Sequence, residues 1–128
     1  MTLEWFIKQN TWLPGGYHGW GNGYVIIPPE HPFHGIHYDQ LNTIISIHGG
    51  ITFSEYGDEI KRWEEYKPEY DNNWIIGFDT CHYDDDLYKW PKSAIEEEVA
   101  NLAKQCEEWD RRYIFDINFH YFPRKLET

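Results

Sequence analysis

The chain has little cysteine and no long apolar run, and each of these absences excludes a class of protein. Its 128 residues include only 2 Cys, too few for the disulfide framework of a small secreted domain. Cys81 and Cys106 also lie outside any Cys-x-x-Cys pair, so we expect reduced, buried thiols. The longest apolar runs, such as Tyr24–Ile27 and Trp74–Ile76, fall well below the roughly 18 residues of a membrane-spanning helix. We therefore expect no membrane anchor.

Positive charge is also scarce. Lys and Arg number 11 against 22 Asp and Glu, which gives a formal net charge of −11. Repulsion from phosphates therefore disfavours binding to duplex nucleic acid. A small phosphorylated ligand is still allowed, because His, Arg and backbone N–H groups act at short range. The segment Met1–Trp5 lacks the pattern of a secretory signal, and we expect a cytoplasmic protein.

Aromatic residues, in contrast, are abundant. They make up 19% of the chain, with 7 Trp, 10 Tyr and 7 Phe, a composition that excludes disorder for most of it. The length suits one domain, and no linker or internal repeat divides the sequence. We expect residues 1–128 to form a single α+β domain, a small antiparallel sheet covered on one face by a C-terminal amphipathic helix.

The clearest predicted element is a helix over Ser93–Arg112. Ser93 and Glu96 have the spacing of a capping box at its start. Apolar residues recur at alternating spacings of three and four, at Ile95, Val99, Leu102, Cys106, Trp109 and Tyr113. We expect this stripe, with Val99, Leu102 and Cys106 at its centre, to be buried against the sheet.

Short segments rich in β-branched and aromatic residues predict the strands. These segments are Tyr24–Ile27, Thr43–Ile47, Ile51–Ser54, Trp74–Asp79 and Tyr113–Phe122. Gly49 and Gly50 predict a tight hairpin turn, with a bulge as the alternative. Asp58–Tyr66 predicts a short helix with Ile60 and Trp63 on one side.

Four segments together resemble a largely uncharacterised family of small proteins encoded by bacteriophages and prophages. They are Gly23–Pro32, Gly35–Asp39, Ile47–Thr52 and Trp74–His82, and they contain the motifs His-Gly-Gly-Ile-Thr and Gly-Phe-Asp-x-x-His. The resemblance covers roughly residues 23–109. It implies a viral protein of the host cytoplasm, with anti-defence and immune evasion as its setting, and it implies no particular chemistry.

Seven histidines in an acidic chain are more than packing requires. His31, His34 and His37 are spaced by three, which would align them along a polyproline-like segment. His34 and His37 are therefore candidate ligand-binding residues. The alternative is that one or two of these imidazoles cap turns through hydrogen bonds to backbone carbonyls.

A second group of candidates begins at His48. Gly49 and Gly50 permit close backbone approach, either within a turn or to a ligand phosphate. Thr52 offers a hydroxyl to an anion. These four residues are candidate ligand-binding residues.

Asp79 and His82 follow the predicted strand Trp74–Asp79 at its exit. They supply an oxygen and a nitrogen ligand for a divalent metal, or a base with its orienting carboxylate. The acidic run Asp84–Asp86 adds further metal ligands or is simply a solvated loop. We expect His48, Asp79 and His82 to converge on one site, because loops gather at the edge of a sheet.

Trp20 and Tyr24 lie in and beside a glycine-rich stretch near the N-terminus. Exposed rings among glycines suit a loop on which a nucleotide base stacks. The alternative is that these rings belong to the core of a small domain.

Three functions fit these residues. The first is a binding protein that encloses a small nucleotide and sequesters a host immune signal. The second is a metal-dependent hydrolase of a nucleotide phosphodiester or glycosidic bond, with Asp79 and His82 as metal ligands and His48 as acid or base. The third is an acidic protein-interaction factor. The identity of the ligand, a divalent metal as cofactor, and assembly into a homo-oligomer stay open.

Overall fold

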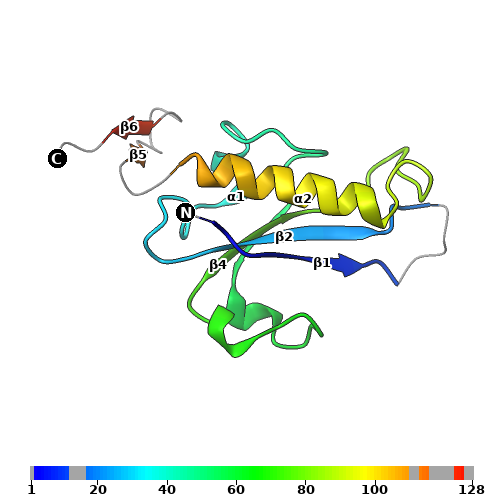
Figure 1. Cartoon of the computed structure of the whole chain (residues 1–128), viewed down its shortest axis with the longest axis horizontal. Coiled ribbons are helices and arrows are strands. Elements are labelled where there is room, and N and C mark those ends of the chain that lie inside the picture. The colour runs from blue at the N-terminus through cyan, green and yellow to red at the C-terminus, as the bar shows by residue number, and fades with distance from the viewer. Residues whose placement is uncertain (1, 12–16, 110–112, 116–122, 126–128) are drawn as a thin grey trace.

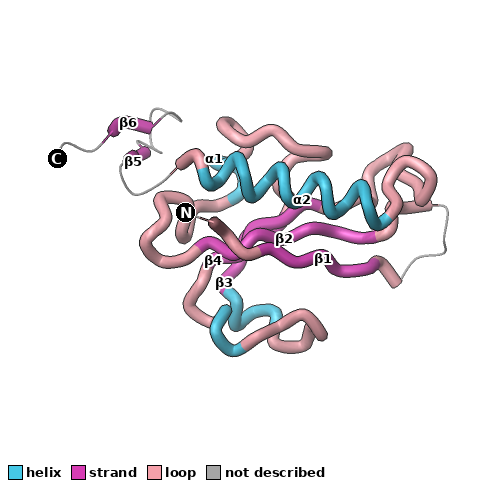
Figure 2. The backbone as a smooth tube through the Cα atoms, in the orientation of Figure 1, coloured by secondary structure: helices cyan, strands magenta, loops and turns pink. Residues whose placement is uncertain are grey.

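The computed structural model describes residues 2–11, 17–109, 113–115 and 123–125. A four-stranded antiparallel sheet has the order β1-β2-β4-β3. Its strands are β1 (Trp5–Gln9), β2 (Gly21–Ile27), β4 (Trp74–Phe78) and β3 (Phe53–Tyr56). Helix α2 (Lys92–Glu107) crosses one face of this sheet (Figure 1, Figure 2). The predicted α+β fold is confirmed.

The central strands β2 and β4 are buried on both faces, which explains their nearly continuous apolar sequences. Val25 and Ile76 face α2, in a core that also contains Leu102. Gly23 lets the helix approach closely, because a Cβ atom there would lie 2.7 Å from Cβ of Val99. The opposite face carries a second apolar cluster. Ile60 and several rings of residues 57–73, which connect β3 to β4 and which we call the segment below the sheet, contribute to it.

Helix α2 buries the predicted stripe from Ile95 to Cys106, but it has different ends, and Trp109 and Tyr113 lie beyond it. Val99, Leu102 and Cys106 are fully buried, as expected. The predicted capping box is wrong, because the helix begins at Lys92 with Pro91 at its N-cap, so Ser93 already lies in the first turn. The carbonyl of Pro91 accepts the first helical hydrogen bonds, and its fixed φ suits this position. The helix ends at Glu107 instead of Arg112.

Two predicted strands are confirmed as β2 and β4, and a third, Ile51–Ser54, begins two residues late as β3. Strand β1 was not predicted, although three of its five residues are apolar; it is an edge strand whose residues are exposed or half-buried. For the predicted strand Tyr113–Phe122, the structure shows β5 (Tyr113–Phe115) paired with β6 (Pro123–Lys125). Residues 116–122 lie outside the described part of the chain.

The predicted strand Thr43–Ile47, and with it the hairpin, is wrong. Side chains take the place of a strand partner here. The Gln105 amide donates to the carbonyl of Ser46 at 2.8 Å and accepts from its N–H at 3.0 Å. The Asn42 amide, just after helix α1 (Tyr38–Leu41), forms the same pair of bonds with Ile51. These bonds satisfy the backbone without a sheet.

The glycine pair does adopt the expected positive φ, at 67° for Gly49 and 78° for Gly50. The turn that they form is closed by a hydrogen bond from Gly50 N–H to the carbonyl of Ile47. The predicted helix Asp58–Tyr66 is a 3₁₀ helix over Gly57–Ile60 only. Ile60 and Trp63 nevertheless share one apolar cluster, as expected.

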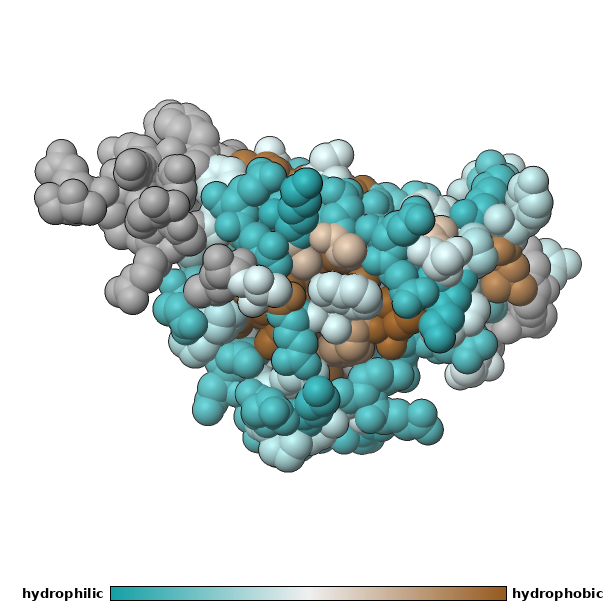
Figure 3. All heavy atoms as spheres, viewed as in Figure 1, coloured by the Kyte–Doolittle hydropathy of each residue, from teal (hydrophilic) through white to brown (hydrophobic). Residues whose placement is uncertain are grey.

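Hydrophilic side chains dominate the outside of α2 and of the segment below the sheet on the face in Figure 3. Over the described residues, no helix combines the length and the apolar character needed to cross a bilayer.

Candidate functional site

Three separate segments meet where β4 ends. The imidazole rings of His48 and His82 lie with their centroids 5.5 Å apart and nearly perpendicular, at 80°. Nε2 of His82 is 3.2 Å from Oδ1 of Asp79. The predicted convergence of His48, Asp79 and His82 is therefore confirmed. We call His48, Thr52, Asp79, His82 and Asp85 the two-histidine site.

His48 is held from three directions. Its Nε2 lies 2.8 and 3.0 Å from the two carboxylate oxygens of Asp85. Its backbone N–H donates to Glu98 on α2 at 2.8 Å, and its ring packs against Trp90 at 4.2 Å between centroids. With Nε2 committed to Asp85, Nδ1 has no hydrogen-bond partner among the described residues. The side chain is 26% exposed.

Asp85 organises this part of the site, and sequence reasoning placed it only in a run of acids. Its side chain is 4% exposed, and Oδ2 also accepts the backbone N–H of His82 at 2.9 Å. The neighbouring Asp84 takes a positive φ of 74°, which turns the loop so that Asp85 points inward. The spacing of three that separates Asp79, His82 and Asp85 was the signal that could have identified this residue.

Asp79 is the second anchor. Its Oδ2 accepts the hydroxyl of Thr52 at 2.8 Å, and its Oδ1 accepts the backbone N–H of Cys81 at 3.0 Å. Thr52 thus gives its hydrogen to a carboxylate instead of leaving it to a ligand. His82 Nε2 is buried and, although close to Asp79, is not aligned for a hydrogen bond.

The glycine pair serves the packing of this site. A Cβ atom on Gly49 would lie 2.1 Å from Nε2 of His82, so only glycine allows the His82 ring to sit there. A Cβ atom on Gly50 would lie 3.2 Å from the Asn42 side chain, and its positive φ also favours glycine.

The structure does not bring the other predicted ligand residues to this site. His34 Nδ1 bonds the carbonyl of Ile27, and its ring contacts Tyr56, which pairs with Trp74 at the opposite end of β4. His37 Nδ1 accepts the N–H of Asp39 at 3.1 Å and caps α1. The interpretation of a histidine that bonds a backbone carbonyl is confirmed for His34, whereas His37 is also a cap but accepts a backbone N–H.

Tyr24 and Trp20 are likewise used for packing. Tyr24 is buried on the face of the sheet opposite to α2, where its ring stacks on Phe6. Burial raises the pKa of its hydroxyl to about 12. Trp20 is partly buried against the main core, with the Lys92 ammonium 5.5 Å from its ring centroid. The alternative interpretation, in which both rings belong to the core, is therefore confirmed.

Neither thiol suits nucleophilic chemistry. Cys81 and Cys106 are unpaired, as expected. Cys106 is buried, whereas Cys81 is only partly so. Burial raises the pKa of the Cys81 thiol, and the charges of Asp79 and Asp85 raise it further. Cys81 is therefore mostly a protonated thiol near neutral pH, which is the unreactive form.

The ligand geometry for a metal is incomplete in the described part of the chain. No group of three or more His, Cys, Asp or Glu residues there is placed to hold a metal ion. Asp79 and His82, the predicted metal ligands, form a pair only.

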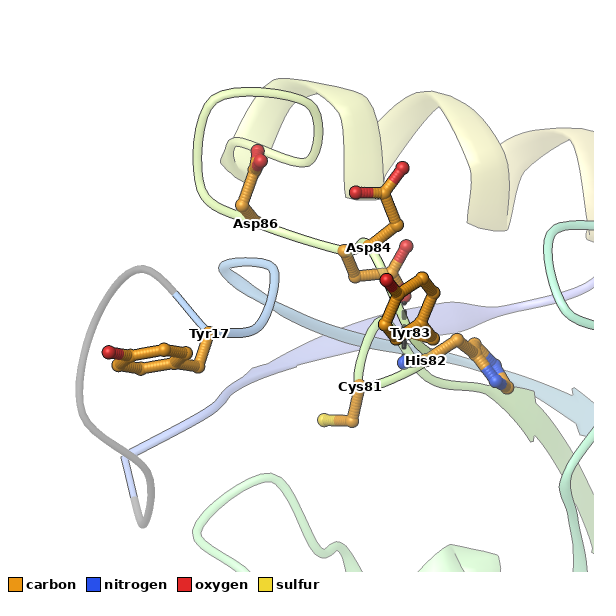
Figure 4. A pocket seen from close by; sticks show the side chains of 7 residues that line it. Tyr17, Cys81, His82, Tyr83, Asp84 and Asp86 are labelled. Carbon is orange, nitrogen blue, oxygen red and sulfur yellow. Dashed lines mark hydrogen bonds between the residues drawn. The ribbon is translucent and has the colours of Figure 1, made fainter.

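A cavity of about 380 Å³ lies beside the loop that carries His82. Figure 4 shows the His82 imidazole pointing away from Tyr17, so the ring does not face the space between Tyr17 and Cys81. The cavity is lined by Tyr17, Cys81, His82, Tyr83, Asp84, Asp85 and Asp86.

Comparison with protein-family models, with curated proteins and with solved structures gave no match to this chain.

Proposed function

We propose that the chain binds a small nucleotide-type ligand at the two-histidine site and holds it without turning it over. The observation that carries the proposal is the pair of partly exposed imidazoles 5.5 Å apart. Each ring lies within ion-pair distance of its own aspartate. Two imidazoles at this separation can contact neighbouring oxygen atoms of one phosphate or ribose.

The rigid support of His48 favours binding. Asp85, Trp90 and the backbone bond to Glu98 fix the ring before any ligand arrives. A ring that is already ordered loses little conformational entropy on binding, so more of its interaction energy appears as affinity. The free Nδ1 of His48 is the atom that we assign to the ligand.

The biological purpose rests on the resemblance to proteins of bacteriophages and prophages. A cytoplasmic viral protein that binds a nucleotide without cleaving it would remove a signal of host immunity, which is an anti-defence function. The chemistry of the site is compatible with this role but does not select among nucleotides.

The second candidate function is hydrolysis, and the His48–Asp85 pair favours it. A carboxylate that orients an imidazole is the arrangement of a general base. Against this, Thr52 and Cys81 do not offer a free nucleophile, for the reasons given above. An acid–base reaction would therefore use water or a hydroxyl of the substrate.

Binding experiments with His48→Ala test the proposal. Cyclic dinucleotides and cyclic ADP-ribose-type signals are titrated calorimetrically, with His37→Ala as the matched control because His37 is an exposed cap remote from the site. Loss of one charge-assisted contact, worth about 1.5–3 kcal/mol, lowers affinity roughly tenfold to a hundredfold. Equal affinities for wild type and His48→Ala would contradict the assignment. Intact ligand released on denaturation supports sequestration, and cleaved products support the hydrolase.

A further inference from the structure

Large side chains are left in solvent at the end of the molecule that carries the loop before α2. Tyr83 is fully exposed, and Tyr88 and Tyr17 are 94% and 78% exposed. Leu87 is also exposed. Rings without packing partners add nothing to the stability of the fold, and clusters of exposed apolar surface mark interaction sites. We call Tyr17, Tyr83, Asp84, Asp86, Leu87 and Tyr88 the tyrosine–aspartate surface.

The charge of this surface is negative, so it favours a partner that carries positive charge. The side chain of Asp84 is 77% exposed and that of Asp86 is 34% exposed. The Lys89 ammonium lies 3.0 Å from Asp84 and 3.9 Å from Asp86. This contact shows that the two carboxylates can receive one cation between them, yet one lysine does not neutralise both.

The chain uses tyrosine and tryptophan rings to hold cations elsewhere. Lys8 lies 5.2 Å from the ring centroid of Trp63, and Lys67 lies 5.9 Å from that of Tyr70. Contacts of this kind contribute about 0.5–1 kcal/mol when exposed and more when desolvated. Tyr83 and Tyr88 have no such cation among the described residues, so their faces are open to one from outside.

We propose that the tyrosine–aspartate surface docks a basic segment of a partner protein, one that presents arginine or lysine beside an apolar residue. Tyrosine is enriched where protein interfaces gain most of their affinity. A cationic side chain fits the cavity of about 380 Å³ between Tyr17, Tyr83 and the aspartates. The apolar residue packs on Leu87 and Tyr88. The net charge of −11 steers a basic partner toward the chain.

The exposed residues of this surface lie outside the two-histidine site, although the cavity beside them is also lined by His82 and Asp85. In Figure 4 the His82 imidazole points away from Tyr17, although the two sites share the loop that carries Asp85. Substitutions of the outward-facing residues Tyr83, Asp84 and Tyr88 therefore leave His48 and its contacts in place. A failure of docking and a failure of nucleotide binding are distinguishable.

The test measures binding of a fluorescein-labelled peptide in which arginine alternates with leucine, by fluorescence anisotropy. A peptide with citrulline in place of arginine keeps the shape and removes the charge. We expect the wild type to bind the arginine peptide and not the citrulline peptide. Tyr83→Ala with Tyr88→Ala, and separately Asp84→Asn with Asp86→Asn, should weaken binding by about tenfold or more. Asparagine also tolerates the positive φ of residue 84.

The matched control is Glu59→Gln with Glu64→Gln, which removes two exposed charges from the segment below the sheet. This variant should bind within about twofold of the wild type, because the position of the charges decides docking. Melting temperatures near that of the wild type verify folding, since Tyr83, Tyr88 and Asp84 are exposed and asparagine at position 86 keeps an oxygen that can accept the N–H of Lys89. The proposal is overturned if the wild type does not bind the arginine peptide, if the loop variants bind it equally well, or if the control loses as much affinity as the aspartate variant.

Discussion

The carboxylate of Asp85 accepts hydrogen bonds from the ring of His48 and from the backbone of His82, and so joins two loops that are distant in sequence. A buried carboxylate is stable only when its oxygens are bonded, and these donors meet that requirement. The orientation of the His48 ring therefore depends on its hydrogen bond to Asp85.

Asp85→Asn tests this dependence. The amide keeps the size of the carboxylate but removes its charge and turns one acceptor into a donor, so the free energy of unfolding should fall by about 1.5–3 kcal/mol. Asp86→Asn, at a more exposed neighbouring position, should change it by less than about 0.5 kcal/mol. Urea denaturation measures both, and equal stabilities of the two variants would contradict the structural role of Asp85.

The thiol of Cys81 should react slowly. Its raised pKa means that, at pH 8, a smaller fraction is thiolate than in an unstructured peptide, and only the thiolate attacks iodoacetamide. The rate should rise with pH and reach the peptide rate after unfolding in urea. Mass spectrometry of the modified chain follows the reaction. Modification of native Cys81 as fast as that of a free peptide thiol would show that the pKa is not raised.

At the scale of elements, helix α2 both covers the sheet and fixes the loop over residues 43–50. One side of the helix is buried against the sheet through Val99 and Leu102, over β2 and β1. Glu98 and Gln105 bond the backbone of that loop. Helix and loop therefore stabilise each other, and the position of His48 depends on both.

Leu102→Ala tests the buried face. Leu102 is fully buried, so truncation should lower the free energy of unfolding by about 2–5 kcal/mol. Glu97→Ala, on the exposed face, is the control and should change it by less than about 0.5 kcal/mol. Denaturant midpoints give the comparison, and an unchanged midpoint for Leu102→Ala would mean that another face of the helix is buried.

The elements that the sequence predicts well are those governed by local periodicity. The stripe around Leu102 and the apolar runs of β2 and β4 have patterns that do not depend on distant residues. The segment Thr43–Ile47 has a strand-like sequence but no strand, because Gln105 bonds the backbone of Ser46 and Asn42 bonds that of Ile51. Gln105 lies 59 positions from Ser46, so no local pattern reveals this bond.

In the candidate site, too, local sequence patterns predict some features and miss others. The motifs around His48 and Asp79 predicted that these residues meet, because each lies at a loop beside a strand. The bonds of Asp85 depend on a loop conformation that includes a positive φ at Asp84. The run of three acids does not show which carboxylate points inward, and only the spacing of three from Asp79 and His82 distinguishes Asp85. Tyr24 was a candidate for ligand binding, and its local sequence does not reveal its burial, because the cluster that buries it includes the distant Ile60 and Tyr70.

At the scale of the whole molecule, the excess of negative charge acts on stability. With 22 acidic against 11 basic residues, the folded chain repels itself, since compaction brings like charges together. The exposed ion pairs, such as Lys67 with Glu4, oppose this only weakly.

Added salt should therefore stabilise the protein. Raising sodium chloride from about 0.01 M to about 1 M shortens the screening length from about 30 Å to about 3 Å, which weakens the net repulsion. We expect a higher melting temperature by circular dichroism at the higher salt concentration. A lower melting temperature would show that attractive ion pairs outweigh the net charge.

The hydrogen bonds of His48 also set the time at which its site can form during synthesis. His48 bonds Asp85, 37 positions later, and Glu98, 50 positions later. A ribosome must therefore translate most of the chain before His48 has either partner, Asp85 for its ring or Glu98 for its backbone N–H, and such distant contacts form slowly. Until then neither of the bonds that orient His48 can form, so the ligand binding that we propose would begin only after the helix that contains Glu98 has left the exit tunnel.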